Sequence, residues 1–180
     1  QNNHTCFHHC KAVLSSQRWK NKKFSSSGNA EPPSIGITLI AVDKFEVYKK
    51  YDYLEEKYIY DDLDAVLNFA KEIKELFKFI GISESGRYLY SIEYDLPSEL
   101  KFEENTNVFK KMSDNYMTDF KEKVDTLVTD LEAVKNEADE VEQCKKLNRI
   151  FGNDFPIPEV DNAAKQQMRY IPPTSSSGVC

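Results

Sequence analysis

Cysteine and histidine, the residues best suited to metal binding or covalent chemistry, gather in the short segment from His4 to Cys10. Cys6, His9 and Cys10 stand at positions i, i+3 and i+4, so one helical turn would bring two thiols and an imidazole to one face. These are ligand types that zinc prefers, and His4 would be a candidate for the fourth ligand. The spacing differs from the CxxC of common zinc modules, and in an oxidising compartment thiols pair before they hold a metal. We therefore expect disulfides here and no metal site.

The four cysteines lie near the ends of the chain, as Cys6, Cys10, Cys144 and Cys180. A bridge between cysteines four residues apart on a helix is poorly oriented and closes a loop too short to stabilise much. We therefore expect Cys6 and Cys10 each to bond to a distant cysteine, Cys144 or Cys180. Such bridges would fasten the N-terminal arm and the C-terminal tail to the body of the chain.

An N-glycosylation sequon, Asn3-His4-Thr5, makes Asn3 a candidate acceptor. The chain opens on Gln1 without an apolar leader, as expected when a signal peptide has been removed. Sequons also arise by chance, so the argument rests on their coincidence with an even number of cysteines. Together these features predict a secreted, extracellular glycoprotein. A lipid or GPI attachment at Cys180 is a less favoured alternative.

Catalytic patterns are scarce in the rest of the chain. All three histidines lie within the first nine residues, so the remainder has no histidine for a Ser–His or Cys–His pair. Glycine-rich, HExxH and EF-hand patterns are absent, and residues 81–86 miss the nucleophile-elbow spacing by one residue. Asp61, Asp62 and Asp64 would suit a divalent cation, but carboxylates at a helix start are also what the helix dipole favours. We expect no catalytic residue, no cofactor and no enzymatic activity.

Charge divides the chain into a basic start and an acidic remainder. Residues 1–24 carry five basic and no acidic residues, a charge of +5. The other residues therefore carry −11, which gives the chain its formal net charge of −6. The candidate polyanion-binding residues interleave cations with an aromatic ring: Arg18, Trp19, Lys20, Lys22 and Lys23. The alternative is that this arm lies against its own acidic body or is solvated. Because the acidic body repels nucleic acid, we expect no nucleic-acid partner.

Composition along the chain predicts three regions. A stretch rich in serine, glycine and proline at 25–34 indicates a linker, so residues 1–34 are interpreted as an arm with its linker. A helical body is expected over 35–155, and a tail rich in proline and serine over 156–180. The longest apolar run, 35–42, is far shorter than the roughly 18 residues needed to cross a bilayer, so we expect no transmembrane span.

Apolar spacing predicts a mainly α-helical fold. Helical spacing is clearest at 61–80, with an aspartate to cap its start and Gly81 placed to end it. A heptad-like stripe over 108–150 predicts one long helix, a rod of roughly 60 Å at ~1.5 Å per residue if unbroken. A rod of that length exceeds a compact domain of this size, so we expect it to bend, to project or to pair with another chain. Residues 35–60 are predicted as helix, although part would suit a strand, and alternation at 88–94 suggests one short strand. The expected fold is an antiparallel helical bundle or helical hairpin, stapled by disulfides, with at most one short strand or hairpin.

The function that best fits these features is non-catalytic. A long amphipathic helix can present its stripe to a protein partner or to a second copy, which predicts an extracellular interaction module, such as a secreted effector or the ectodomain of a surface protein. The alternative is a secreted carrier of lipids or other apolar ligands. Ten tyrosines and eleven phenylalanines are more aromatic volume than a small bundle needs, and such rings line lipid cavities well.

Overall fold

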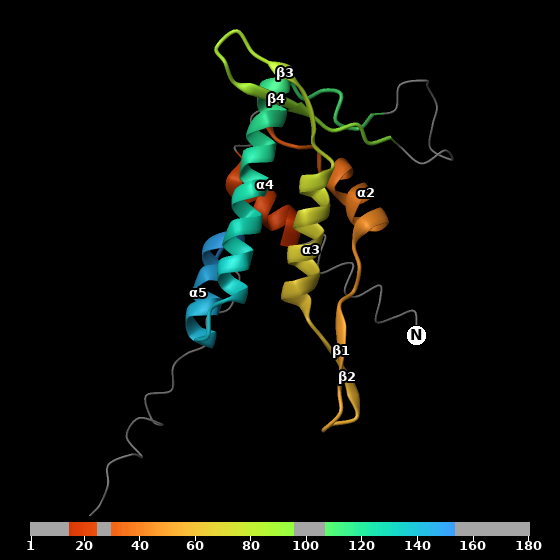
Figure 1. The fold of residues 1–180 in the computed structure, drawn as a ribbon, viewed down its shortest axis with the longest axis vertical. Helices are drawn as coiled ribbons and strands as arrows, with labels where there is room; N and C mark the ends of the chain where they lie inside the picture. Colours follow the sequence, from red (N-terminus) through yellow and green to blue (C-terminus); the bar gives the residue numbers. More distant parts are fainter. Residues whose placement is uncertain (1–14, 25–29, 96–106, 154–180) are drawn as a thin grey trace, which may run out of the picture.

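The computed structural model describes residues 15–24, 30–95 and 107–153. About 56% of these residues are helical and 15% lie in strands. Residues 15–23 form the first described helix. The elements that follow are α2 (Ser34–Lys44), β1 (Lys49–Asp52), β2 (Lys57–Tyr60), α3 (Asp62–Glu75), β3 (Lys78–Ile82), β4 (Tyr88–Ser91), α4 (Asp114–Lys135) and α5 (Glu140–Phe151). The strands form two separate antiparallel hairpins, β1–β2 and β3–β4 (Figure 1).

The prediction of a mainly α, disulfide-stapled bundle is therefore wrong: the described part of the chain is a mixed α and β fold with two hairpins. Cys144, the one cysteine in that part, is free. The bridge expected at Cys144 is thus not formed. The other predicted cysteines, Cys6, Cys10 and Cys180, and the sequon residue Asn3 lie outside the described residues.

The predicted helix over 35–60 splits into α2 and the β1–β2 hairpin. α2 ends at Lys44, and Phe45 after it is extended. The side chain of Asp52 accepts hydrogen bonds from the backbone N–H of Leu54 (2.8 Å) and Glu55 (3.3 Å), which closes the turn between the strands. Aspartate favours such turns, and aromatic and β-branched residues such as those of β2 favour strands. The chain therefore reverses at 53–56 rather than continuing as helix.

The predicted helix over 61–80 is also shorter than expected, because α3 ends at Glu75 and β3 follows it. Gly81 does not end a helix but lies in β3, next to a register shift in its pairing with β4. The predicted start is confirmed: the Asp61 side chain accepts a hydrogen bond from the Asp64 N–H at 2.9 Å. The strand expected at 88–94 is confirmed as β4.

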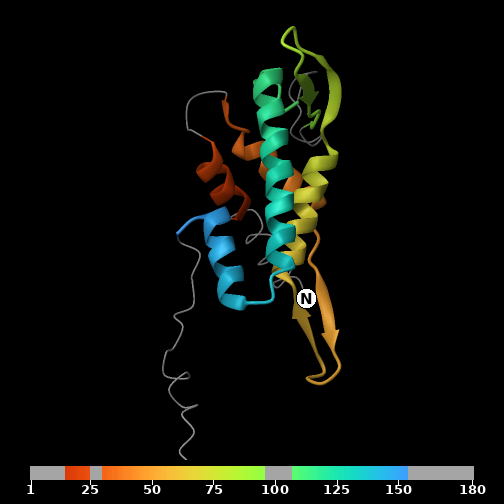
Figure 2. The same ribbon diagram turned by 60° about the vertical axis from the view of Figure 1, so that its left-hand side comes forward.

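The long helix predicted over 108–150 is broken into two helices. α4 has 22 residues and is about 33 Å long at ~1.5 Å per residue. α5 folds back beside α4 after a short turn (Figure 2). Gln143 fixes this turn, because its side-chain amide donates to the carbonyls of Val134 (3.2 Å) and Glu137 (2.9 Å). The stripe therefore packs within the chain and does not form a projecting rod.

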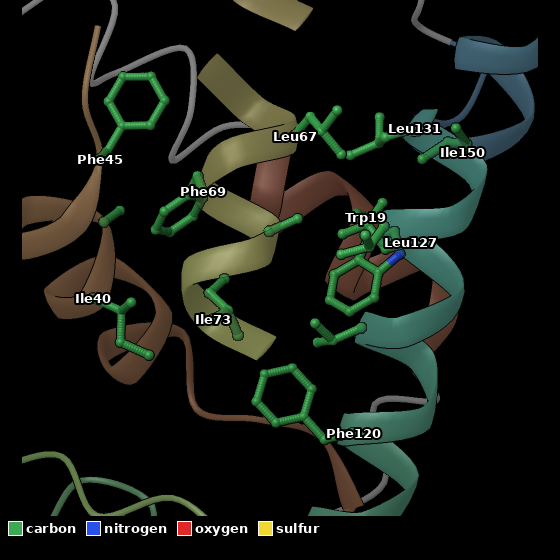
Figure 3. Close-up of a cluster of buried hydrophobic side chains, with 14 of the residues drawn as sticks. Trp19, Ile40, Phe45, Leu67, Phe69, Ile73, Phe120, Leu127, Leu131 and Ile150 are labelled. Atoms are coloured by element: carbon green, nitrogen blue, oxygen red, sulfur yellow. The ribbon is translucent and has the colours of Figure 1, made fainter. Parts of the chain in front are cut away.

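The hydrophobic core lies between α3 and α4 and is completed by α2, α5 and residues 15–24 (Figure 3). Phe120 is fully buried at its centre. Its ring centroid lies 5.2 Å from that of Phe77, 6.0 Å from Phe24 and 6.4 Å from Trp19. The predicted arm thus contributes two aromatic rings to the same core as the predicted body.

The two hairpins lie at opposite ends of the α3–α4 pair (Figures 1 and 2). β4 packs against the first half of α4, where the Tyr90 N–H donates to the Thr118 hydroxyl at 3.2 Å. β1–β2 instead extends beyond the helices into solvent. Across the described ranges, no helix combines the length and the apolar character that a bilayer crossing requires.

Candidate functional site

The β1–β2 hairpin carries large apolar side chains that the fold does not bury. At its turn, Tyr53 is 85% and Leu54 95% exposed. No residue of β1 or β2 is buried. The exposed set is Tyr48, Tyr51, Tyr53, Leu54, Tyr58, Ile59 and Tyr60. Contiguous exposed apolar surface of this kind marks interaction sites.

The strand register sorts most of the tyrosines onto one face. Lys49 pairs with Tyr60 and Tyr51 pairs with Tyr58, so these four side chains point to the same side of the hairpin. The Tyr51 ring centroid lies 5.1 Å from those of Tyr58 and Tyr53, and the Lys49 ammonium lies 4.7 Å from the Tyr58 centroid. We call the surface made by Lys49, Tyr51, Tyr53, Tyr58 and Tyr60 the tyrosine face.

The opposite face of the hairpin is tied to the helices by charge. The Lys50 ammonium lies 3.7 Å from the Asp61 carboxylate and 4.0 Å from that of Asp64. Asp64 is only 6% exposed and also lies 2.5 Å from the Lys135 ammonium, at the end of α4. This contact raises the pKa of Lys135. The Asp61 N–H donates to the Tyr48 carbonyl at 2.9 Å, so the base of the hairpin is joined directly to the start of α3.

The chemistry of the tyrosine face suits protein recognition. A tyrosine ring offers a broad apolar surface with few rotatable bonds, and its hydroxyl both donates and accepts hydrogen bonds. Residues 49–60 hold three lysines and three acidic residues, so the hairpin has no formal net charge in a chain of −6. A partner that binds this hairpin would therefore contact its rings and hydroxyl groups, and would not need a particular net charge.

A polar groove of about 1010 Å³ lies between α2 and the end of β4, with Asp43 and Tyr94 among its lining residues. The Tyr94 hydroxyl donates to the Asp43 carboxylate at 2.7 Å. Burial, and then this bond, raise the pKa of Tyr94, and the same bond lowers the pKa of Asp43. At neutral pH the phenol is thus protonated and held by an ionised carboxylate, a satisfied pair rather than an activated nucleophile.

The residues predicted to bind polyanions are Arg18, Trp19, Lys20, Lys22 and Lys23. Trp19 is 3% and Lys20 4% exposed, and the Lys20 ammonium lies 2.8 Å from the Ser34 hydroxyl. Lys22 donates to two carbonyls in the last turn of α5, at 2.5 and 3.2 Å. Arg18 and Lys23 are exposed. The structure therefore uses part of this set within the fold, and polyanion binding stays a prediction.

The sequence offered two candidate metal-binding sets, and the structure describes only one of them. Asp61, Asp62 and Asp64 lie at the start of α3, where Asp61 caps the helix and Asp64 pairs with lysines. Within the ranges that the structure describes, no group of three histidine, cysteine or acidic residues is arranged to hold a metal ion. The set formed by His4, Cys6, His9 and Cys10 lies outside those ranges.

Sequence reasoning missed the tyrosine face because it assigned residues 35–60 to one helix. Two signals were present: the aromatic and β-branched run at 57–60 and the turn-forming Asp52. No model of a known protein family matches this chain, and no curated protein matches it.

Proposed function

We propose that this protein is a non-catalytic extracellular interaction module that binds a protein partner through the tyrosine face. The observation that carries the proposal is the row of exposed tyrosines on one face of a hairpin that projects from the core. Tyrosine is enriched in the centres of protein interfaces, where its ring fills space and its hydroxyl finds a partner.

The hairpin replaces the long helix as the docking element in this proposal. The apolar stripe of α4 includes Phe120, Leu131 and Val134, and all three are fully buried in the chain's own core. A helix can dock through its stripe only if that stripe is free. The stripe of α4 is therefore not available to a partner, whereas the tyrosine face is exposed.

A carrier of apolar ligands, the alternative function, has less support. The enclosed apolar space lined by Trp19, Phe120 and Leu127 measures about 20 Å³. That volume is close to the space of one water molecule and far below a ligand pocket of about 300 Å³ or more. Most aromatic side chains of the described residues fill the core or lie exposed on the hairpins.

The extracellular part of the proposal rests on the sequon at Asn3. Its test is peptide-N-glycosidase treatment of the protein secreted by eukaryotic cells. We expect a loss of mass in the wild type and none in Asn3→Gln. An unmodified wild-type protein retained inside the cell would contradict the assignment.

Binding is tested with three full-length proteins: the wild type, Tyr51→Ser/Tyr53→Ser/Tyr58→Ser, and a matched control, Ile80→Ser/Ile82→Ser/Tyr88→Ser. The control removes three exposed apolar side chains from the other hairpin. Cross-linking on intact cells identifies the partner, which is then purified and titrated against each protein.

We expect the tyrosine variant to raise the Kd by about 30-fold or more, because loss of hot-spot aromatic rings costs at least ~2 kcal/mol. The control should bind as the wild type does. Equal binding by all three proteins, loss of binding in the control alone, or no protein partner at micromolar concentration would each refute the proposal.

A further inference from the structure

β1 has an edge that no strand of the described residues covers, because β1 pairs with β2 alone. The Asp61 N–H bonds to the Tyr48 carbonyl, and the register pairs Lys50 with Ile59. Hydrogen-bonded and non-hydrogen-bonded pairs alternate along an antiparallel ladder. Lys50 therefore directs its backbone groups toward β2, whereas Lys49 and Tyr51 direct theirs outward.

The open edge lacks some of the protections that native edge strands carry. Residues 49–53 contain no proline, and the β1–β2 register has no bulge. Lysines often protect an edge by repulsion, but here each has a nearby partner: Lys49 lies over the Tyr58 ring and Lys50 faces Asp61. An unpaired strand edge of this kind is a template for another strand.

We propose that β1 pairs antiparallel with β1 of a second copy of this chain, so that the two hairpins form one four-stranded sheet. The pairing places Tyr51 opposite Tyr51 of the second copy. This inference goes beyond the proposed function, because it uses the edge of the hairpin and leaves the tyrosine face free for another partner.

Charge selects this register from the possible ones. Since Lys49 and Tyr51 are the residues of β1 that direct backbone groups outward, allowed registers differ by steps of two residues. With Tyr51 opposite Tyr51, Lys50 of each copy lies opposite Asp52 of the other, which makes two attractive pairs. One step in either direction places Lys50 opposite Lys50 or Asp52 opposite Asp52, and like charges directly opposite are destabilising.

The same register gives the tip residues a role. Leu54, which is 95% exposed, comes next to Tyr48 of the second copy, and Tyr53 comes opposite its Lys49. An exposed leucine and a lysine beside an aromatic ring both gain contacts by this pairing. The edge is thus complementary to itself in charge and in apolar surface.

The edge of β2 is less suitable for the same pairing. The β2 register that pairs opposite charges would place Lys57 opposite Asp61 of the second copy. The Asp61 carboxylate already caps α3 at 2.9 Å and lies 3.7 Å from Lys50. Pairing through β2 would compete with that cap, whereas pairing through β1 leaves it intact.

Assembly through β1 would place the tyrosine faces of both copies on one side of the shared sheet, because paired residues point to the same side. A partner with two sites would then bind a continuous surface, and a second contact within one complex strengthens binding without new chemistry. The dimer therefore predicts the stoichiometry of the proposed interaction: two copies of this chain bind one partner molecule that has two sites.

The test uses the full chain and reversal of the two paired charges. Analytical ultracentrifugation of the wild type at micromolar concentrations should show a reversible dimer of twice 20.8 kDa. K50E and D52K each replace both attractive pairs by repulsive ones, so each should raise the dimer Kd by about tenfold or more. An equimolar mixture of K50E and D52K restores both attractive pairs and should restore a heterodimer.

Matched controls separate the register from net charge and from misfolding. Lys111→Glu makes the same charge change at an exposed site outside the hairpin and should dimerise as the wild type does. D52K also removes the aspartate of the turn, so recovery in the mixture shows that its hairpin still forms. Disulfide-linked dimers are recognised on a non-reducing gel and are not counted.

A wild type that stays monomeric, a K50E protein that dimerises normally, or a mixture that does not recover would overturn the proposal. Loss of the dimer in Lys57→Glu but not in K50E would assign the interface to β2 and also overturn it. Binding of the purified partner to K50E is measured separately. A failed dimer with intact partner binding refutes this inference alone, and the reverse result refutes only the proposed function.

Discussion

Among single residues, Gly36 is a helical glycine that cannot be replaced by alanine without a steric clash with Phe109. Glycine within a helix is ordinarily less stable than alanine by about 1 kcal/mol. A Cβ at Gly36 would lie 2.6 Å from Cζ of Phe109, a buried ring stacked on Phe120. The ring has little room to move, so the close approach outweighs helix propensity.

We expect Gly36→Ala to lower the free energy of unfolding by about 1 to 3 kcal/mol, the usual cost of overpacking a core. Urea denaturation measures this change. Gly36→Ala should lower the free energy of unfolding less in a Phe109→Leu background than in the wild type, because leucine leaves more room for the Cβ. A more stable Gly36→Ala protein would show that Phe109 moves freely.

Asp125 gives the fold a dependence on acid. Burial alone would raise its pKa, but the ammonium groups of Lys121 at 2.7 Å and Lys74 at 3.2 Å outweigh burial and hold the pKa below its ordinary value. The unfolded chain therefore binds the proton more tightly than the folded chain. The stability that this group contributes is complete above its unfolded pKa of about 4 and is lost as the pH falls through the folded pKa.

We expect the free energy of unfolding to fall steeply below about pH 4 and the slope to be smaller in Asp125→Asn. Chemical denaturation at a series of pH values from neutral to acidic measures the slope. Asp130→Asn, on the same helix, is the control for the loss of one carboxylate. Identical slopes in both variants would remove Asp125 from the explanation.

At the scale of elements, α5 exists as a separate helix because Asp139 caps it. The carboxylate accepts hydrogen bonds from the N–H groups of Val141 (2.8 Å) and Glu142 (3.0 Å). These donors lie in the first turn and have no carbonyl partner within the helix. The cap and the Gln143 contacts to the preceding turn together hold α5 beside α4.

Asp139→Ala should lower the free energy of unfolding by about 1 kcal/mol, the usual cost of losing an N-cap. Asp139→Asn should lose much less, since asparagine caps as well as aspartate does. Thermal unfolding gives the size of each effect, and hydrogen exchange locates it in α5. Equal losses in the two variants would mean that charge, rather than capping, is what matters at this position.

At the scale of the whole molecule, the β1–β2 hairpin is separable from the core. None of its strand residues is buried, and its ends are held together by the bond from the Asp61 N–H to the Tyr48 carbonyl. We expect replacement of residues 49–60 by a short Gly/Ser turn to change the melting temperature by only a few degrees. The change should be small because the replacement removes no buried residue from the core and because a shorter loop costs less entropy to close.

The same replacement should abolish both partner binding and dimerisation. Circular dichroism follows the melting temperature, and ultracentrifugation follows the assembly state. A protein that fails to fold without the hairpin would show that Lys50 and its contacts with Asp61 and Asp64 are structural. The hairpin would then be part of the core's stability and not a separable docking element.

The elements whose signals are local can be predicted from the sequence alone. The start of α3 follows from Asp61 as a capping residue, and the apolar stripes of α3 and α4 follow from their spacing. The turn before β4 and the strand itself follow from a polar segment and the alternation at 88–94. Each of these patterns is complete within one segment, so no distant residue is needed to interpret it.

Contacts between distant segments set where α3 stops, how residues 35–60 divide and which tyrosines stay exposed. β3 is a strand because β4 pairs with it and α4 supports β4, contacts between segments that no single window of sequence contains. A short apolar run such as 76–82 fits helix and strand equally well until its partner is known. Burial is likewise a property of the assembled fold: Trp19 lies in the core and Tyr53 faces solvent, although both were merely aromatic residues in the sequence.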